Sequence, residues 1–409
     1  MPNRPYEDVR VVGHLIDSGI MSAIMDAIVA LDCEFETMQF EVGRTNDDPS
    51  TAVLRIKAPD ASRLGEVLGI IQEHGAVPVD LEDVKLVAAE MDGVFPEDFY
   101  ATTNLETFVR LDGTWVAVEG VEMDLGIRVE PASRSACTVP MADVRVGELY
   151  VVGHAGLRVR PQERPREKQA FEFMSSAVSS EKPKAQVVAD VARMLREVRD
   201  SGRSTIVVAG PAVVHTGAAP HLARLIEMGY VNVLFGGNAV AVHDIESALF
   251  GTSLGVSMAE GRPTVGGHEH HLRSINTVRR CGSIAAAVEQ GVLTGGLMHT
   301  LVTTGTPYVL AGSVRDDGPL PDVITDAIEA QRAMRPYCRD AGACLMLSTM
   351  LHSIATGNML PASVQTVCVD INPAVVTKLA DRGSWQTIGI VTDVGLFLEQ
   401  LANELQAIG

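Results

Sequence analysis

The chain has 409 residues, which is too long for one ordinary domain and predicts two or three. Hydrophobic residues make up 46% of the chain and charged residues 21%, a balance typical of globular proteins. Asp and Glu total 52 against 33 Lys and Arg, so the formal net charge is −19. This acidity argues against binding to nucleic-acid phosphates or to an anionic membrane surface.

Six cysteines are scattered along the chain without a CxxC pair. Their spacing favours reduced thiols and argues against a structural zinc centre. The N-terminal sequence MPNRPYEDVR lacks the apolar core of a signal peptide, and no apolar run reaches the ~18 residues of a membrane span. We therefore expect a cytoplasmic protein with no membrane and no nucleic-acid partner.

The first 83 residues predict elements in the order β-α-β-β-α-β. Strands are expected at residues 9–16, 34–42, 50–58 and 76–81, and helices at 19–31 and 60–75. Asp60 is expected to cap the second helix, and Gly75 to end it. This order is typical of the split βαβ, or ferredoxin-like, plan, so residues 1–83 are assigned to such a domain.

Residues 84–185 differ in composition from the preceding domain and fall into two parts. Residues 84–160 contain short strands separated by Gly and Pro, which predicts a small β-rich module. Residues 161–185 concentrate charge, Pro and Ser, and predict a connector between domains.

Residues 186–409 alternate amphipathic helices with buried strands, which predicts an α/β domain. The six expected strands cover residues 204–210, 230–237, 306–313, 343–349, 366–372 and 388–394. Apolar strands separated by helices favour a mainly parallel, doubly wound sheet of Rossmann-like type.

Small or polar residues follow every one of these strands. In an open α/β sheet, ligands bind at the carboxyl ends of the strands. Glycine lets backbone amides approach a phosphate, and a strand-end acid such as Asp370 can accept hydrogen bonds from ribose hydroxyls. The residues concerned are Gly210, Pro211, Thr216, Asn238, Ala239, Gly312, Ser313, Thr349, His352, Asp370, Asn372 and Asp393. A strict GxGxxG is absent and each loop alone could be an ordinary turn, but the six together favour a dinucleotide site.

Three histidines in the run GGHEHH, His268, His270 and His271, raise the question of a metal site. Closely spaced neutral imidazoles can bind zinc, but HxHH lacks the i, i+4 spacing that places two ligands on one helix face. We therefore favour a Gly-rich active-site loop with hydrogen-bonding histidines, in which His268 contacts substrate, and we expect no metal.

Two features bear on the type of chemistry. Asp316 and Asp317 follow the third strand, so one can cap the loop while the other faces a ligand, unless both belong to a solvated turn. In residues 186–409, after the connector, the sequence contains one lysine, Lys378, which is expected on the surface of a helix. Schiff-base chemistry needs a buried amine in the site, so hydride transfer on a nicotinamide fits better.

Long stretches of the chain resemble one family, the archaeal and cyanobacterial type of ornithine cyclodeaminase. This family carries the region named after lysine-oxoglutarate reductase/saccharopine dehydrogenase. The matching stretches include GHLIDSGIM, DGVFPEDFYATTN, FEFMSSAVSSEKP, VVAGPAVVHTGA, GGNAVAVHDIE, AGSVRDDGPLPDVITD and CVDINPAVVTKL. The resemblance extends over nearly the whole chain, and only to the cyclodeaminase part of the bifunctional cyanobacterial forms, so we expect no arginine dihydrolase domain.

The resemblance implies a tightly bound NAD that is reduced and reoxidised within one turnover. Hydride leaves the α-carbon of ornithine, the δ-amine attacks that carbon, ammonia departs, and hydride returns to give proline. Phosphate and ribose contacts would fall on the strand-end residues already named, except Thr216 and Asp393. Asp244 and Asp317 are the candidates beside the nicotinamide and the substrate amines, and Asp316 is a third candidate catalytic residue.

Asn104 and Arg128 of the β-rich module are the candidates for the substrate carboxylate. A homodimer or homotetramer is expected. Two alternatives stay open: an NAD-dependent dehydrogenase or cyclase for another diamino acid, and a non-catalytic amino-acid sensor.

Overall fold

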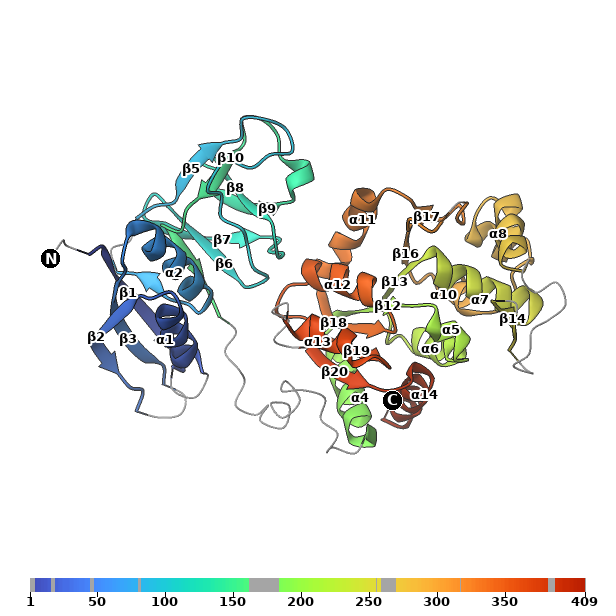
Figure 1. The fold of residues 1–409 in the computed structure, drawn as a ribbon. Helices are drawn as coiled ribbons and strands as arrows, with labels where there is room; N and C mark the ends of the chain where they lie inside the picture. The colour runs from blue at the N-terminus through green and yellow to red at the C-terminus, as the bar shows by residue number, and fades with distance from the viewer. Residues whose placement is uncertain are drawn as a thin grey trace. The chain divides into compact units, whose positions relative to one another are not determined.

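The computed structural model describes residues 4–15, 19–44, 48–79, 82–161, 184–254, 256–258, 270–316, 318–381 and 387–408. The chain divides into two compact units, Met1–Lys168 and Gln169–Gly409 (Figure 1). The predicted connector at 161–185 lies mostly outside the described residues. The boundaries predicted for the smaller domains therefore stay predictions.

The N-terminal unit begins with the split βαβ arrangement. Its elements are β1 (Tyr6–Gly13), α1 (Ile20–Ala30), β2 (Glu34–Glu41), β3 (Ser50–Lys57), α2 (Ala61–Glu73) and β4 (Val77–Pro78). The antiparallel sheet has the order β2-β3-β1-β4, and Ile24, Ile28 and Ile71 of the two helices pack on its inner face. As expected, the Asp60 side chain caps α2 by accepting a hydrogen bond from the Arg63 backbone.

The same unit contains a second, seven-stranded sheet of order β11-β6-β7-β9-β8-β10-β5. Its strands are β5 (Lys85–Ala88), β6 (Thr107–Leu111), β7 (Thr114–Glu119), β8 (Gly126–Glu130), β9 (Ser135–Val139), β10 (Leu149–Val152) and β11 (Leu157–Val159). Gln72 of α2 donates to the carbonyls of Leu157 at 2.7 Å and His154 at 3.2 Å. These hydrogen bonds join α2, which packs on the first sheet, to the second sheet of the unit.

The C-terminal unit is built on a parallel sheet of order β17-β16-β13-β12-β18-β19-β20 (Figure 1). The strands are β12 (Ser204–Ala209), β13 (Val233–Gly237), β16 (Tyr308–Ala311), β17 (Val323–Ile324), β18 (Ala341–Leu347), β19 (Gln365–Asp370) and β20 (Thr387–Val391). The fold class is confirmed, and β17 adds a seventh strand to the six expected. Two residues are too short for a periodic signal, so β17 could not be recognised in the sequence.

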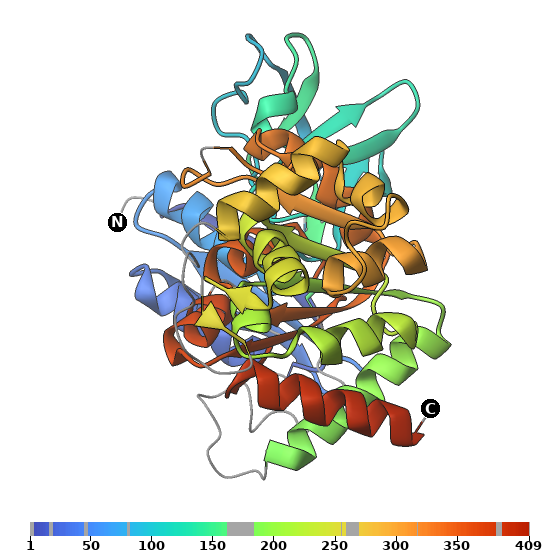
Figure 2. The same ribbon diagram turned by 90° about the vertical axis from the view of Figure 1, so that its right-hand side faces the viewer.

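Helices cover both faces of this sheet. One face carries α4 (Lys184–Asp200), α5 (Ala212–His215), α6 (Ala219–Glu227), α7 (Asn238–Phe250), α8 (His270–Cys281), α9 (Ile284–Glu289), α10 (Leu297–Thr304) and α14 (Val394–Ile408). The other carries α11 (Ala327–Arg339), α12 (Met350–Met359) and α13 (Pro373–Asp381). A short hairpin of β14 (Thr252–Ser253) and β15 (Val256–Ser257) follows α7, and α4 lies beside α14 (Figure 2).

Among the described residues, we find no helix with both the length and the apolar character that crossing a membrane requires.

Candidate dinucleotide site

The order in which the chain adds strands to the C-terminal sheet reverses between the central strands β12 and β18. From β12 the chain proceeds to β13 and β16 on one side, and then from β18 to β19 and β20 on the other. Apart from the extra β17, this is the doubly wound order in which a ligand binds beyond the carboxyl ends of the strands at the reversal. The loops after β12 and β18 flank that point.

Gly210 follows β12 in close contact with the loop after β18. A Cβ placed on Gly210 would lie 2.1 Å from the carbonyl oxygen of Ser348. Ser348 itself has a positive φ of 50°, an uncommon and strained conformation for a residue with a side chain. Because glycine has no Cβ, the loops after β12 and β18 can approach each other closely, and a phosphate group can approach the backbone at this position.

Two helices begin at this edge without a side-chain cap among the described residues. Gly237 is the N-cap residue of α7 and has no side chain, and the side chain of Thr349, the N-cap residue of α12, makes no capping hydrogen bond. The unpaired backbone N–H groups of such a helix end favour an anion. His352 of α12 lies near Gly237, whose Cβ would be 3.2 Å from its Cε1 atom. The two helix ends therefore belong to one site, and their chemistry fits a phosphate.

His352 brings a neutral imidazole to this edge. Burial lowers the pKa of His352, and the nearby Asp316 carboxylate partly opposes that shift. A neutral imidazole can accept a proton at physiological pH.

The loop after β16 is ordered by the predicted residues themselves. Asp316 accepts a hydrogen bond from the Ser313 backbone at 2.8 Å, and Asn238 donates to its other oxygen at 3.4 Å. The side-chain oxygen of Asn238, Oδ1, accepts a hydrogen bond from the Leu320 backbone N–H at 3.0 Å. Asp316 is thus the carboxylate that caps the loop, one of the two roles expected for the Asp316–Asp317 pair.

Three further predicted cofactor residues, Asp370, Asn372 and Asp393, lie at the ends of β19 and β20 on the same edge. Asp370 is buried at the end of β19 and accepts from the Asn372 backbone at 2.8 Å, while Asn372 caps α13. Asp393 caps α14 through the Leu396 backbone, and a Cβ on Gly395 would lie 3.3 Å from Thr216 Oγ1. Each of these polar groups has a local structural role that does not exclude a ligand.

Asp244, expected beside the nicotinamide, lies inside the fold. Its side chain is fully buried, and its two oxygens accept hydrogen bonds from the Leu297 and Met298 backbones, each at 2.8 Å. Burial raises the pKa of Asp244 to about 6, although the two backbone bonds oppose the shift. These bonds hold the start of α10, so they give the catalytic role expected for Asp244 no support.

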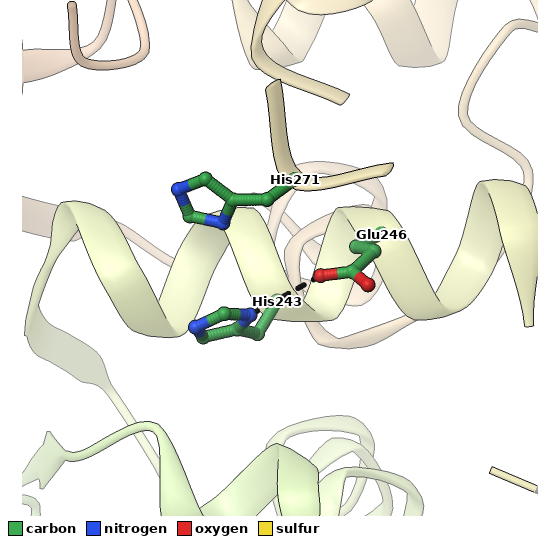
Figure 3. A group of neighbouring side chains, drawn as sticks. All are labelled: His243, Glu246 and His271. Carbon is green, nitrogen blue, oxygen red and sulfur yellow. Dashed lines mark hydrogen bonds and ion pairs between the residues drawn. The ribbon is translucent and has the colours of Figure 1, made fainter. Parts of the chain in front are cut away.

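A cluster of histidines that the sequence did not indicate lies beside α7. His243 and Glu246 of α7 meet His271 of α8 (Figure 3), and the His215 ring is 4.7 Å from the His243 ring. His215 Nδ1 in turn lies 2.6 Å from Ser253 Oγ. In the sequence, His271 is noticeable only as part of the GGHEHH run. Its partners in the structure, His243 and Glu246, belong to another helix, α7, so the run gave no indication of them.

The predicted substrate contacts lie on separate parts of the chain. Asn104 and Arg128 belong to the N-terminal unit, where Asn104 is buried and Arg128 pairs with Glu148 at 2.6 Å. Asp317 and His268 lie outside the described residues.

Three features define a Rossmann-type dinucleotide-binding protein. They are the reversal of the strand order between β12 and β18, the close-approach glycine Gly210, and the uncapped N-termini of α7 and α12. Residues 189–401 match the family described as "Arginine dihydrolase ArgZ-like, C-terminal, Rossmann fold". Residues 6–105 match the "LOR/SDH bifunctional enzyme conserved region", and residues 106–188 the "ArgZ-like, C-terminal, first region". The chain belongs to the archaeal and cyanobacterial ornithine cyclodeaminase family, as the sequence resemblance implied.

The similarity to individual relatives extends over the whole chain. Ornithine cyclodeaminase of Methanopyrus kandleri is 52% identical over 403 residues, which cover 98% of both chains. The structure of ArgZ, an arginine dihydrolase from cyanobacteria, has a TM-score of 0.87 at 42% identity and 99% coverage of this chain. The complex of AgrE with ornithine and NAD+ has a TM-score of 0.54 at 45% identity and 99% coverage. The chain spans 58% of the length of each of these two longer proteins.

Proposed function

We propose that this protein is an NAD-dependent ornithine cyclodeaminase that converts L-ornithine to L-proline and ammonia. The observation that carries the proposal is the close-approach Gly210 at the switch point, the place between β12 and β18 where the strand order of the Rossmann sheet reverses. The chain that contains this site is 52% identical to a named ornithine cyclodeaminase. The crystal structure of AgrE in a ternary complex with ornithine and NAD+ supports the assignment of substrate and cofactor.

The residues at the switch point fit NAD. Gly210 permits close backbone approach, the first turns of α7 and α12 offer unpaired N–H groups, and Asp370 offers a carboxylate for ribose hydroxyls. When bound, NAD supplies removal of a hydride from the substrate α-carbon and its later return.

The side chains of the protein would handle the protons. His352, kept neutral by burial, can accept a proton from a substrate ammonium group. Because Asp316 is engaged in capping its loop, we assign the contact with the substrate amines to Asp317. Asn104, Arg128 and His268 remain our proposed contacts for the rest of the substrate.

The deciding experiment incubates purified protein with L-ornithine and measures proline, ammonia and NADH together. We expect equal amounts of proline and ammonia without accumulation of NADH. Accumulation of NADH would favour a dehydrogenase acting on a diamino acid. Tight ornithine binding without turnover would favour the sensor. Copurified NAD, detected by mass spectrometry, would support the cofactor assignment independently.

We further propose that the protein is a cytoplasmic homodimer or homotetramer. All six cysteines are free thiols, which is consistent with a reducing compartment. Light scattering after size-exclusion chromatography tests the oligomeric state. A monomeric mass would contradict it.

A further inference from the structure

Three side chains with metal-ligating atoms converge between α7 and α8. They are His243 and Glu246 of α7 and His271 of α8 (Figure 3), and one ligand atom from each lies within 4.8 Å of the others. The carboxylate of Glu246 has no exposed surface, and His243 is 4% exposed. This burial distinguishes the group from the acidic clusters that are common on protein surfaces.

The spacing on α7 places two of the ligands together. Residues three apart lie on one face of a helix, and the same spacing of Glu and His supplies ligands in carboxylate-bridged metal proteins. His243 Nδ1 and Glu246 Oε2 are 3.3 Å apart. Two ligands held about 2.05 Å from a tetrahedral zinc ion are separated by about 3.3 Å, so this pair already has the required separation.

Neighbouring groups fix the orientation of the Glu246 carboxylate. Thr252 Oγ1 donates to Oε1 at 2.9 Å, and the Leu254 backbone donates to Oε2 at 3.2 Å. Thr252 Oγ1 also lies 2.8 Å from His270 Nδ1. Hydrogen bonds of this kind to a ligating carboxylate are the usual second layer of support around a protein metal site.

The third ligand is poised without a partner. His271 Nδ1 is buried and has no hydrogen-bond partner among the described residues. The His271 ring faces the His243–Glu246 pair, with one ring nitrogen directed toward it (Figure 3). A buried polar atom left unpaired costs about 1–3 kcal/mol, a cost that a bound ligand would remove.

We propose that His243, Glu246 and His271 bind one divalent cation of the zinc class. Two imidazoles and one carboxylate are a known ligand set for Zn²⁺, and three protein ligands leave at least one coordination position open. The GGHEHH run alone lacks the spacing for a metal site, whereas the structure supplies two of the three ligands from α7.

The test measures metal binding by the full-length protein after chelator treatment and dialysis. Isothermal titration with Zn²⁺, and elemental analysis of the loaded protein, should give one ion per chain. His243→Ala, Glu246→Gln and His271→Ala should each weaken binding by more than about tenfold. His299→Ala, which removes a histidine of α10 outside the cluster, should bind as the wild type does. These readouts do not involve ornithine, so they can fail while the proposed function holds, and the reverse.

A second measurement needs no variant and covers the case in which a substitution unfolds the protein. X-ray absorption of the zinc-loaded wild-type protein should show nitrogen and oxygen ligands that include two imidazoles. Sulfur ligands would overturn the proposal, because they would place the ion at cysteines. Absence of stoichiometric binding, or variants with wild-type affinity, would also overturn it.

Discussion

The carbonyl oxygen of Ser348 occupies the space that a side chain at Gly210 would need. A Cβ on Gly210 would lie 2.1 Å from that oxygen, and Gly210 donates its own N–H to Leu347 at 2.8 Å. The loops after β12 and β18 are therefore in close contact at the point where the strand order of the sheet reverses. This contact explains why the strand end needs glycine even without a strict GxGxxG motif.

Gly210→Ala should therefore disturb the cofactor site directly. Because the obstructing atom belongs to the backbone, the loops must separate, and we expect at least about tenfold weaker NAD binding by calorimetry. Gly295→Ala is the matched control, since a Cβ there meets nothing within 4 Å. Equal NAD affinity in the two variants would show that NAD does not depend on this contact.

The strand pattern revealed the sheet because buried parallel strands are continuous apolar runs, as in β12 and β18. It also located the carboxyl edge, where Gly210, Asn238 and Asp316 lie. It could not show what a polar side chain contacts. The sequence predicts a catalytic role for Asp244, whereas its oxygens bind the start of α10, 53 and 54 residues later in the chain. His271 likewise meets partners on another helix, and periodicity carries no information on such contacts.

Asp370 provides a test of the ribose assignment. Asp370→Asn keeps an oxygen for the Asn372 backbone but loses the charge that strengthens hydrogen bonds to hydroxyls. We expect NAD affinity to fall by about tenfold or more, with little change in the free energy of unfolding. Calorimetry with NAD and urea denaturation measure the two effects. Unchanged affinity would move the ribose contact to another strand end.

Substitutions of Asp244 can distinguish a structural role of this residue from a catalytic one. Asp244→Ala leaves two buried N–H groups at the start of α10 without an acceptor, so we expect a loss of about 2–4 kcal/mol in the free energy of unfolding. Asp244→Asn should lose less, because one oxygen remains. Urea denaturation gives the energies, and kcat per folded molecule is measured alongside. A stable variant with a greatly reduced kcat would instead establish a catalytic role.

His352 should contribute a pH dependence of stability. Because burial lowers its pKa in the folded protein, the unfolded chain binds the proton more tightly. The contribution is complete above the ordinary histidine pKa of about 6.5 and is lost as pH falls below it toward the lowered value, by at most about 1.4 kcal/mol per pH unit. His352→Asn should remove this component, so the wild type should lose more stability than the variant between pH 7.5 and 5.5. Parallel loss in both proteins, measured by urea denaturation, would show that His352 is readily protonated in the folded state and would contradict its assignment as a neutral proton acceptor.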